Sequence, residues 1–240
     1  MSIQIGFDFL INMSSVSCMA EAADKPCATH LPQNGQSERL SRQRARTRAA
    51  LLGAAQRLLA EQHRADMSIR EITEAANVGF GTFYGHFANK TDLFEAAVSM
   101  TLEQHGVRLE STVANLDDSA EMFAVGVRLT CRLQRNHPQV ARIMLRVGLP
   151  RLVSSVGLAP RCRALLRASE AAGRLRVGDL EVALASAGGS LLGLMQVLDA
   201  EPHMDAEKAS DHLAANLLCM FGLSHGEAWA VATRPLPVLS

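Results

Sequence analysis

The sequence is poor in aromatic residues and has no net excess of charge. Phe, Tyr and Trp together make up 4% of the 240 residues, with one Tyr and one Trp. Because sheets are usually cored by β-branched and aromatic side chains, this composition favours helices cored by Leu, Ala, Val and Met. The formal net charge is zero. A zero sum by itself argues against a nucleic-acid-binding protein, but the distribution of charge along the chain matters more than its sum.

Signatures of catalysis and of metal binding are also missing. The five cysteines are scattered and form no Cys-x-x-Cys pair, and the eight histidines show no metal-ligand spacing. This pattern offers no zinc site and fits a reducing cytoplasm. The sequence contains no Gly-x-Ser-x-Gly, no phosphate-binding glycine loop and no His-Glu-x-x-His. We therefore expect a protein that is not an enzyme and that uses no metal and no cofactor.

The first 38 residues show no sustained hydrophobic periodicity. They contain prolines, a glycine and several Ser and Asn residues, so we expect a mostly disordered extension over residues 1–38. The apolar opening at residues 3–11 has no basic segment before it and no small-residue cleavage site after it. We therefore expect no secretory signal and a cytoplasmic protein. Met13 is an alternative start to Met1, and the sequence leaves the two open.

Positive charge is concentrated between residues 39 and 90. This stretch holds nine basic and four acidic residues, an excess of five positive charges. Alternating arginines, Arg42, Arg44, Arg46 and Arg48, lie early in a helix predicted over residues 41–62. Arg42, Arg44 and Arg46 could follow a DNA backbone or enter a minor groove, and a solvated run of charge is the alternative.

Residues 68–90 carry the pattern of a helix-turn-helix. Ser68 and Glu71 form a predicted capping box that begins a short helix. Asn77, which tolerates a left-handed backbone, ends that helix. Gly79 is an acceptable N-cap for a second helix predicted over residues 80–87. Two short helices across a tight turn are the motif whose second helix enters the DNA major groove.

A known family shares this stretch. The run VGFGTFYGHF at positions 78–87, followed by NKTDL at positions 89–93, resembles the DNA-binding domain of tetracycline-repressor-like regulators over residues 42–100. The resemblance implies an all-α protein with a three-helix DNA-binding domain over residues 39–100 and a helical effector-binding and dimerisation domain over residues 101–240. It further implies a homodimeric repressor, released from a pseudo-palindromic double-stranded operator by an unknown small molecule. The alternatives are an activator, an effector-independent regulator, or a helical enzyme or carrier.

Candidate DNA contacts follow from the two faces of the second helix. Phe83 and Phe87 lie four apart and face inward, which turns Thr82, Gly85 and His86 outward. The resemblance implies that Thr82 and Tyr84 touch phosphate or base edges, to which their hydroxyls are suited, and that His86 faces the DNA. A cation in the first turn of the next helix suits a phosphate. For Thr82 and Tyr84 the alternatives are a local backbone bond and a place in the core, and Phe80 either touches a thymine methyl or packs locally. The candidates are Arg46, Arg70, Phe80, Gly81, Thr82, Tyr84, Gly85, His86 and Lys90.

The rest of the chain is predicted to be helical. Asn89 or Thr91 caps a helix with Leu93, Ala97 and Met100 on its inner face. Capping residues and prolines then delimit five further helices, near residues 118–137, 138–148, 160–173, 179–198 and 205–223. A second capping box, at residues 118–121, begins the first of them. A polar tail with prolines is predicted after the last.

The predicted helix over residues 180–198 contains a single charge, Glu181, and so raises a transmembrane alternative. Its polar residues and glycines, and the absence of a second such span, favour a buried helix and no contact with a membrane. Ala185, Gly189 and Gly193 form a seam of small residues that lets another helix approach closely. The last predicted helix offers a matching apolar stripe, with Leu213, Leu217 and Met220. The resemblance implies that these two helices form the dimer interface, as a four-helix bundle.

A ligand pocket is predicted among apolar residues of the C-terminal domain. The candidate lining residues are Met100, Gln104, Phe123, Cys131 and Met144, with Gln104 or Cys131 as the polar contact. The alternative is that these residues belong to an ordinary helical core.

Overall fold

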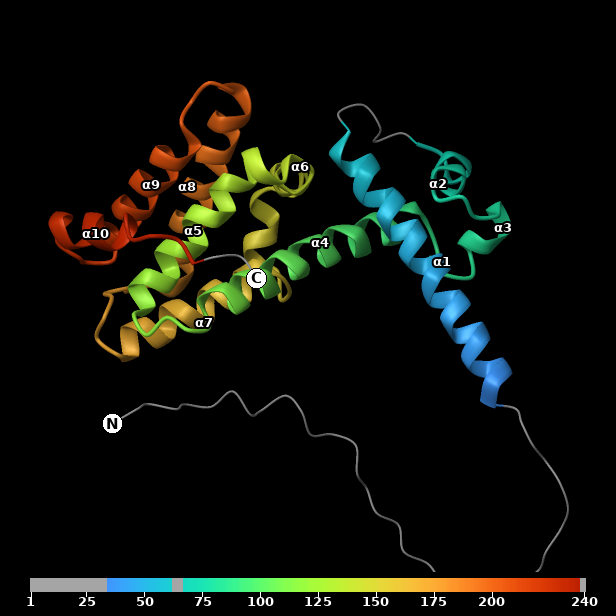
Figure 1. Ribbon diagram of the computed structural model, residues 1–240, viewed down its shortest axis with the longest axis horizontal. Helices are drawn as coiled ribbons and strands as arrows, with labels where there is room; N and C mark the ends of the chain where they lie inside the picture. Colours follow the sequence, from blue (N-terminus) through green and yellow to red (C-terminus); the bar gives the residue numbers. More distant parts are fainter. Residues whose placement is uncertain (1–33, 62–66, 238–240) are drawn as a thin grey trace, which may run out of the picture. The chain divides into compact units, whose positions relative to one another are not determined.

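A computed structural model describes residues 34–61 and 67–237, and within them the chain contains helices and no strand. The predicted all-α class is therefore confirmed. Backbone contacts divide the chain into two units, residues 1–40 and residues 41–240. The elements are α1 (Asn34–Ala60), α2 (Ile69–Ala75), α3 (Phe80–Phe83), α4 (Lys90–Val113), α5 (Ser119–Asn136), α6 (Pro138–Val147), the 3-10 helix η1 (Leu149–Val153), α7 (Leu158–Ala171), α8 (Leu180–Ala200), α9 (Ala206–Met220) and α10 (His225–Ala232) (Figure 1).

Helices α1 to α3 and the start of α4 share one apolar core. Leu51 of α1, Ile72 of α2, Phe83 of α3 and Leu93 of α4 are fully buried there. The segments that join these helices are fixed by local hydrogen bonds. Ser68 and Glu71 form the predicted capping box, and the Asn89 side chain caps α4 through the amide of Asp92. These short-range bonds fix where α2 and α4 begin, and the shared apolar core packs the four helices together.

The turn between α2 and α3 is a Schellman motif around Asn77. Asn77 has a φ of 54°, the left-handed region that its short polar side chain tolerates. The amide of Val78 donates to the carbonyl of Thr73 at 2.9 Å, and the amide of Asn77 donates to that of Glu74 at 3.0 Å. Both bonds satisfy carbonyls at the end of α2. The predicted break at Asn77 is confirmed.

The predicted start of α1 and the predicted end of α3 were wrong. Helix α1 begins at Asn34 and not near residue 41, so residues 34–38 are helical; residues 1–33 lie outside the described part of the chain. Helix α3 ends at Phe83 and not at Phe87. The chain continues from Phe83 as a turn, in which the amide of Phe87 donates to the carbonyl of Phe83 at 3.0 Å. Gly81 and Gly85 lower the helix propensity of this stretch, which explains the short helix.

Helix α5 lies at the centre of the C-terminal region and packs against α6, α7, α8, α9 and α10. Asp118, Asp179 and Asp205 cap α5, α8 and α9 with their carboxylates. The predicted capping box at residues 118–121 is replaced by a different arrangement. Asp118 accepts a bond from the amide of Ala120, and Glu121 forms an ion pair with Arg234. The C-terminal tail is thereby attached to the start of α5.

Helix α10 was not predicted from the sequence, which indicated a polar tail after residue 223. Ser224 caps α10 through the amide of Glu227, and the helix packs against α9. Ala228, Val231 and Ala232 are buried in the same core cluster as α5 and α9. The signal was weak because alanines and one valine carry the apolar face of an eight-residue helix.

The helix predicted to be buried over residues 180–198 is buried on only one face within the chain. Among the described residues, α8 is the one helix long and apolar enough to cross a membrane, with a mean hydropathy of 1.4 over a window that is 22% buried. One face packs inward through Leu184, Ala187, Met195 and Leu198. The opposite face is exposed, with Val182 at 63%. Within one chain, α8 is therefore half covered.

Candidate DNA-binding surface and effector pocket

The α3 segment presents two faces, as its sequence pattern predicts. Phe83 and Phe87 are buried in the N-terminal core. Thr82 and Gly85 are exposed, and Tyr84 is 57% exposed. The alternative that Tyr84 belongs to the core is wrong, although its ring contacts Phe83 edge-on, with 5.4 Å between centroids. A phenol hydroxyl and a threonine hydroxyl are therefore open to solvent on the outer side of the motif.

Phe80 adds an exposed aromatic ring beside Tyr84. It is 53% exposed, and its ring meets that of Tyr84 edge-on, with 6.1 Å between centroids. Local packing on Tyr84 thus accounts for part of its position. The exposed part of the ring remains available for an apolar contact such as a thymine methyl group.

Two arginines of α1 hold the end of the α3 segment. Arg44 donates to the carbonyl of Gly85, and Arg48 donates to the carbonyl of His86, each at 3.1 Å. The Arg48 guanidinium also lies 4.4 Å from the centroid of the Phe87 ring. From the sequence, Arg44 was placed in a run of charge and Arg48 was given no role of its own. Neither bond could be predicted from spacing, because 38 to 41 residues separate donor and acceptor.

The side chain of His86 is half-buried between the outer face and these arginines. Partial burial, followed by the charges of Arg44 and Arg48, lowers the pKa of His86 below its ordinary value of 6.5. Near neutral pH the ring is therefore uncharged. A neutral imidazole has one donor and one acceptor nitrogen, so it suits hydrogen bonding better than attraction to phosphate charge.

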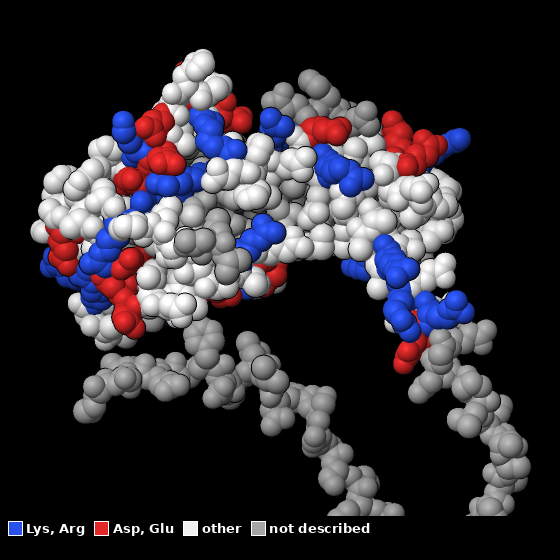
Figure 2. Space-filling view, viewed as in Figure 1, with Lys and Arg blue, Asp and Glu red and all other residues white. Residues whose placement is uncertain are grey.

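The other basic candidates lie at the surface. Arg46 is exposed on α1. Arg70 is exposed on α2, where it pairs with Glu74 at 3.1 Å. Lys90 is the first residue of α4 and is half-buried. Figure 2 shows Lys and Arg side chains gathered along the N-terminal part of α1. Apart from Glu38, this part of α1 carries only positive charge, at residues 39, 42, 44, 46 and 48.

The two glycines of the α3 segment have different reasons to be small. A Cβ atom on Gly85 would lie 3.3 Å from the carbonyl oxygen of Thr82, so the fold itself favours glycine there. A Cβ atom on Gly81 would meet nothing within 4 Å. No contact among the described residues therefore requires glycine at position 81. The lack of a side chain there agrees with close approach of an external partner.

The predicted lining residues of a ligand pocket do not come together. Met100 packs at the edge of the N-terminal core, and Gln104 is exposed on α4. Phe123 and Cys131 lie in the main core of the C-terminal region, where burial raises the pKa of the Cys131 thiol to about 12. Met144 belongs to a third cluster, with residues of α4 and α6. None of these five residues lines the pocket described next, and their part in ligand binding stays a prediction.

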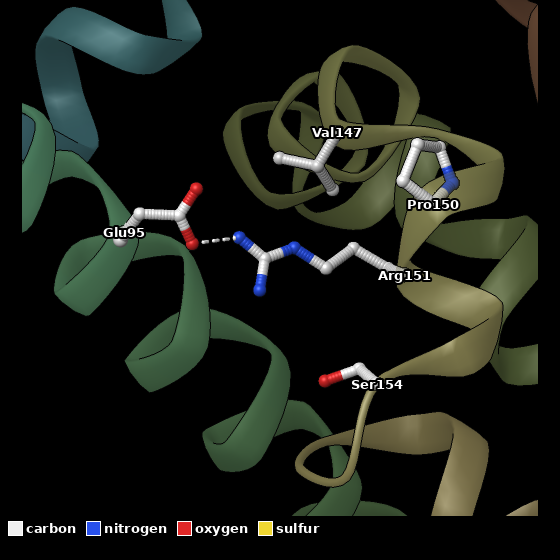
Figure 3. A pocket seen from close by; sticks show the side chains of 5 residues that line it. All are labelled: Glu95, Val147, Pro150, Arg151 and Ser154. Carbon is white, nitrogen blue, oxygen red and sulfur yellow. Dashed lines mark hydrogen bonds and ion pairs between the residues drawn. The ribbon is translucent and has the colours of Figure 1, made fainter.

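A pocket of about 330 Å³ lies elsewhere, between α4 and the α6–η1 segment. Figure 3 shows the ion pair that crosses it, in which Arg151 of η1 donates to the Glu95 carboxylate of α4 at 2.5 Å. The pocket is lined by Glu95, Val147, Pro150, Arg151 and Ser154. No sequence motif marks these residues, and 56 positions separate the two members of the ion pair.

The predicted interface residues fall into two groups. Ala185 and Gly193 are exposed on α8, and Gly189 is half-buried, with nothing within 4 Å of an added Cβ atom. Leu213 is half-buried on α9, and Met220 is 46% exposed. Leu217 is buried in the main core, so it was wrongly assigned to an outer face. Val182 and Val197 extend the exposed face of α8 and were missed.

Sequence profiles of two domains match this chain. Residues 51–97 match the bacterial regulatory proteins of the tetR family, and residues 118–234 match the tetracyclin repressor-like C-terminal domain. The chain belongs to the TetR family. It is a transcriptional regulator with an N-terminal DNA-binding helix-turn-helix, and the family resemblance stated from residues 78–93 is confirmed.

Solved structures of TetR-like proteins resemble the chain over most of its length. RolR without ligand is 32% identical, with a TM-score of 0.68 over 80% of this chain and 100% of RolR. RolR in complex with resorcinol is 31% identical, with a TM-score of 0.61 over 83% of this chain and 100% of RolR. SmeT, the repressor of the Stenotrophomonas maltophilia multidrug efflux pump SmeDEF, is 21% identical, with a TM-score of 0.62 over 80% and 96% of the two chains. At that identity SmeT shares the fold alone.

A curated relative from Mycobacterium tuberculosis, the HTH-type transcriptional regulator Rv1255c, is 29% identical over 91 residues. The alignment covers 38% of this chain and 45% of the relative, so the chain spans less than half the length of that protein.

Proposed function

We propose that this TetR-family regulator is a homodimeric repressor that a small molecule releases from its operator. The observation that carries the proposal is the outer face of the α3 segment. There Thr82 and Tyr84 are exposed beside a small Gly81, while α1 arginines hold the end of the segment. Such a face can approach base edges closely while positive charge on α1 contacts phosphates.

The DNA contacts are assigned from this geometry. Thr82, Tyr84 and His86 supply hydrogen-bonding groups to bases or phosphates, and the Phe80 ring supplies an apolar contact. Gly81 and Gly85 allow the backbone to lie close to the DNA. Arg46, Arg70 and Lys90 neutralise phosphates, which gives affinity without sequence preference.

Dimerisation is assigned to the exposed face of α8 together with the outer side of α9. Val182, Ala185, Gly193 and Val197 lie on the uncovered side of α8, and Met220 lies at the exposed end of α9. A second copy of the chain would cover this apolar face in a four-helix bundle. Two recognition segments in one dimer can then reach half-sites about 34–36 Å apart, one turn of DNA.

Release by a small molecule is supported by RolR, which is 31% identical to this chain and whose solved complex contains resorcinol. A ligand shifts such a regulator only if it binds the released state more tightly than the DNA-bound state. An effector-independent regulator or an activator of the same fold would lack this response or reverse it.

The decisive experiment is a titration of the intergenic DNA upstream of the protein's own gene, with scrambled DNA as competitor. We expect a specific footprint with two half-sites, and loss of expression of a reporter placed behind it. Equal affinity for the scrambled competitor would contradict a sequence-specific regulator. A rise in reporter expression would make the protein an activator.

The dimer assignment has its own test. Gly189→Leu places a large side chain where an added Cβ atom meets nothing within 4 Å, so the single chain should fold normally. A docked second chain would be pushed away, because overpacking a close contact costs about 1–3 kcal/mol. Sedimentation should then show a folded monomer with little operator affinity. A dimer with normal affinity would place the interface elsewhere.

A further inference from the structure

We propose that the pocket between Glu95 and Arg151 is the effector site, that its ligand is an uncharged ring compound with hydroxyl groups, and that the ligand acts by separating this ion pair. The inference rests on the proposed function, since it names the site and the ligand class of the release step. It moves the site away from the core residues that the sequence indicated.

The lining of the pocket defines the class of ligand. Glu95 offers an acceptor and Arg151 offers donors, and their formal charges cancel. An anion would compete with Glu95 and a cation with Arg151, and each would leave one charged partner unpaired. A hydroxyl group can donate to the carboxylate and accept from the guanidinium, so a neutral molecule satisfies both.

The remaining walls suit a small ring. Val147 and Pro150 provide apolar surface on the side of α6 and η1, as Figure 3 shows. Ser154 accepts a bond from the amide of Val156 at 3.2 Å, which leaves its hydroxyl proton to serve as a donor. A volume of about 330 Å³ lies at the small end of the range for ligand pockets. A single substituted ring fits this combination of size and polarity.

The position of Glu95 connects the pocket to the DNA-binding helices. Leu93 and Ala97, two residues away on either side, are fully buried in the core shared with α1, α2 and α3. Glu95 itself is on the opposite face of α4, toward η1. A displacement of α4 at Glu95 is therefore transmitted directly to the core that carries the α3 segment, because packed cores move as units.

The α6–η1 segment is attached to the N-terminal helices at a second point. Arg146, at the end of α6, donates to the carbonyls of Leu59 and Glu61, the latter at 2.6 Å. On the other side, η1 is seated on α8, since a Cβ atom added to Gly188 would overlap the side chain of Leu152. The segment thus contacts the DNA-binding helices on one side and the proposed dimer helix on the other.

A ligand inserted between Glu95 and Arg151 removes one of these two polar attachments. The bonds from Arg146 would remain as the other. The distance between the two recognition segments of a dimer depends on how α1 to α3 are attached to the rest of each chain. Looser attachment of these helices therefore lowers operator affinity. The coupling expected for such a switch is about 5- to 150-fold in affinity.

The test uses the full-length protein and two matched variants. Glu95→Gln removes the charge that holds Arg151, and Glu103→Gln removes the partner of Arg161 on the same helix, outside the pocket. Operator affinity is measured by fluorescence anisotropy, alone and with catechol, resorcinol or hydroquinone. Benzoate and benzylamine serve as anionic and cationic rings of similar size. Calorimetry measures binding of each compound directly.

We expect at least one dihydroxybenzene to bind the wild-type protein and to lower operator affinity about tenfold or more, with no comparable effect of benzoate or benzylamine. Without ligand, Glu95→Gln should already bind the operator about tenfold more weakly and respond no further, while Glu103→Gln should behave as wild type. Melting curves of both variants should match the wild type.

Three outcomes would overturn the inference. They are tighter binding of a charged ring, no binding of any dihydroxybenzene, and a Glu95→Gln variant with wild-type affinity and response. Failure of the proposed function is distinguishable, because the wild-type protein would then show no specific operator binding in the absence of any compound.

Discussion

The N-terminal helices and the C-terminal region are held together by polar contacts of different range. Around α2 and α3 the capping bonds are short in sequence, as in the capping box of Ser68 and Glu71, and only the arginines of α1 reach the α3 segment from a distance. In the C-terminal region they join distant residues. Arg128 of α5 bonds to Asp211 of α9 at 2.6 Å and to the carbonyl of Arg234 at 2.7 Å. The first region is built to present an outer face, and the second to fix several helices around a buried centre.

Buried polar groups make the C-terminal region sensitive to conditions that the N-terminal helices tolerate. Arg128 and His105 are buried, and each depends on partners in other elements. A buried charge or ring that is deprived of its partner is costly. Within the N-terminal helices, by contrast, the exposed side of α3 can change without affecting the core. The exposed face of α3 should therefore tolerate substitution better than the buried polar contacts of the C-terminal region.

The largest effect should be a difference in the free energy of unfolding between variants of the buried and the exposed face of α3. Phe83→Ala empties a fully buried site and should lower the free energy of unfolding by about 3–5 kcal/mol. Phe80→Ala, on the exposed side, should change it by less than about 0.5 kcal/mol. Denaturant titrations of the two variants measure the difference. Equal decreases would mean that Phe80 supports the fold as much as Phe83 does.

The C-terminal region should become less stable in mild acid through His105. Its Nε2 lies 3.0 Å from the Thr130 hydroxyl, and burial lowers the pKa of His105 from 6.5 to about 4. Between these values the unfolded chain binds the extra proton. The free energy of unfolding is therefore unaffected by His105 above pH 6.5. It falls by about 3 kcal/mol as the pH decreases from 6.5 to about 4.

His105→Gln provides the control for this pH effect, because an amide can bond to Thr130 without titrating. Its unfolding free energy should be flatter than that of the wild type between pH 7 and pH 4. The pKa of Asp118, lowered chiefly by its hydrogen bond with Arg174, places the titration of that carboxyl below this window. Identical pH profiles of variant and wild type would exclude His105 as the titrating group.

A smaller effect should appear in DNA recognition alone. Thr82→Ala combined with His86→Ala deletes two candidate base-reading side chains from the outer face. Operator affinity should fall by about 1–3 kcal/mol for each hydrogen bond to a base that is removed, while the melting temperature stays close to that of the wild type. Titration of operator against scrambled DNA measures the decrease. Undiminished discrimination would show that this segment does not read the sequence.

The smallest effect should come from a single phosphate-binding side chain. Arg46→Ala should weaken binding to operator and scrambled DNA alike. The slope of log K against log salt should become shallower by about 1, since one fewer counterion is released. Arg70→Ala is a useful second variant, because Arg70 already pairs with Glu74 and should lose less affinity than Arg46 does. Salt titrations that superimpose on the wild type would remove Arg46 from the interface.

The sequence was sufficient for those features that depend on neighbouring residues. The cap at Ser68, the left-handed Asn77 and the inward pair Phe83 and Phe87 were all predicted, because each signal spans four or five consecutive residues at most. Only part of the exposed face of α8 was predicted. A single chain's pattern does not distinguish burial within the chain from exposure toward a second one, and so Val182 was missed.

The pocket at Glu95 and Arg151 and the arginine bonds that hold α3 could not be predicted in this way. Glu95 meets Arg151, and Arg44 meets Gly85, only after distant helices have packed. The sequence offers many Glu and Arg residues, and no local rule selects these pairs. Phe123 and Cys131 were predicted to line a pocket from composition alone, and the structure places both in the main core of the C-terminal region.

The position of the single tryptophan has a practical consequence for spectroscopy. Trp229 lies on α10, is 38% exposed, and contacts His212 of α9 in a tilted arrangement with 4.7 Å between ring centroids. Because no other residue of its type is present, the intrinsic indole emission of the whole protein originates at this one place on the outside of the C-terminal region. It reports the solvation of the α9–α10 surface without an added dye, and an effector that changes the DNA-binding helices alone would leave it silent.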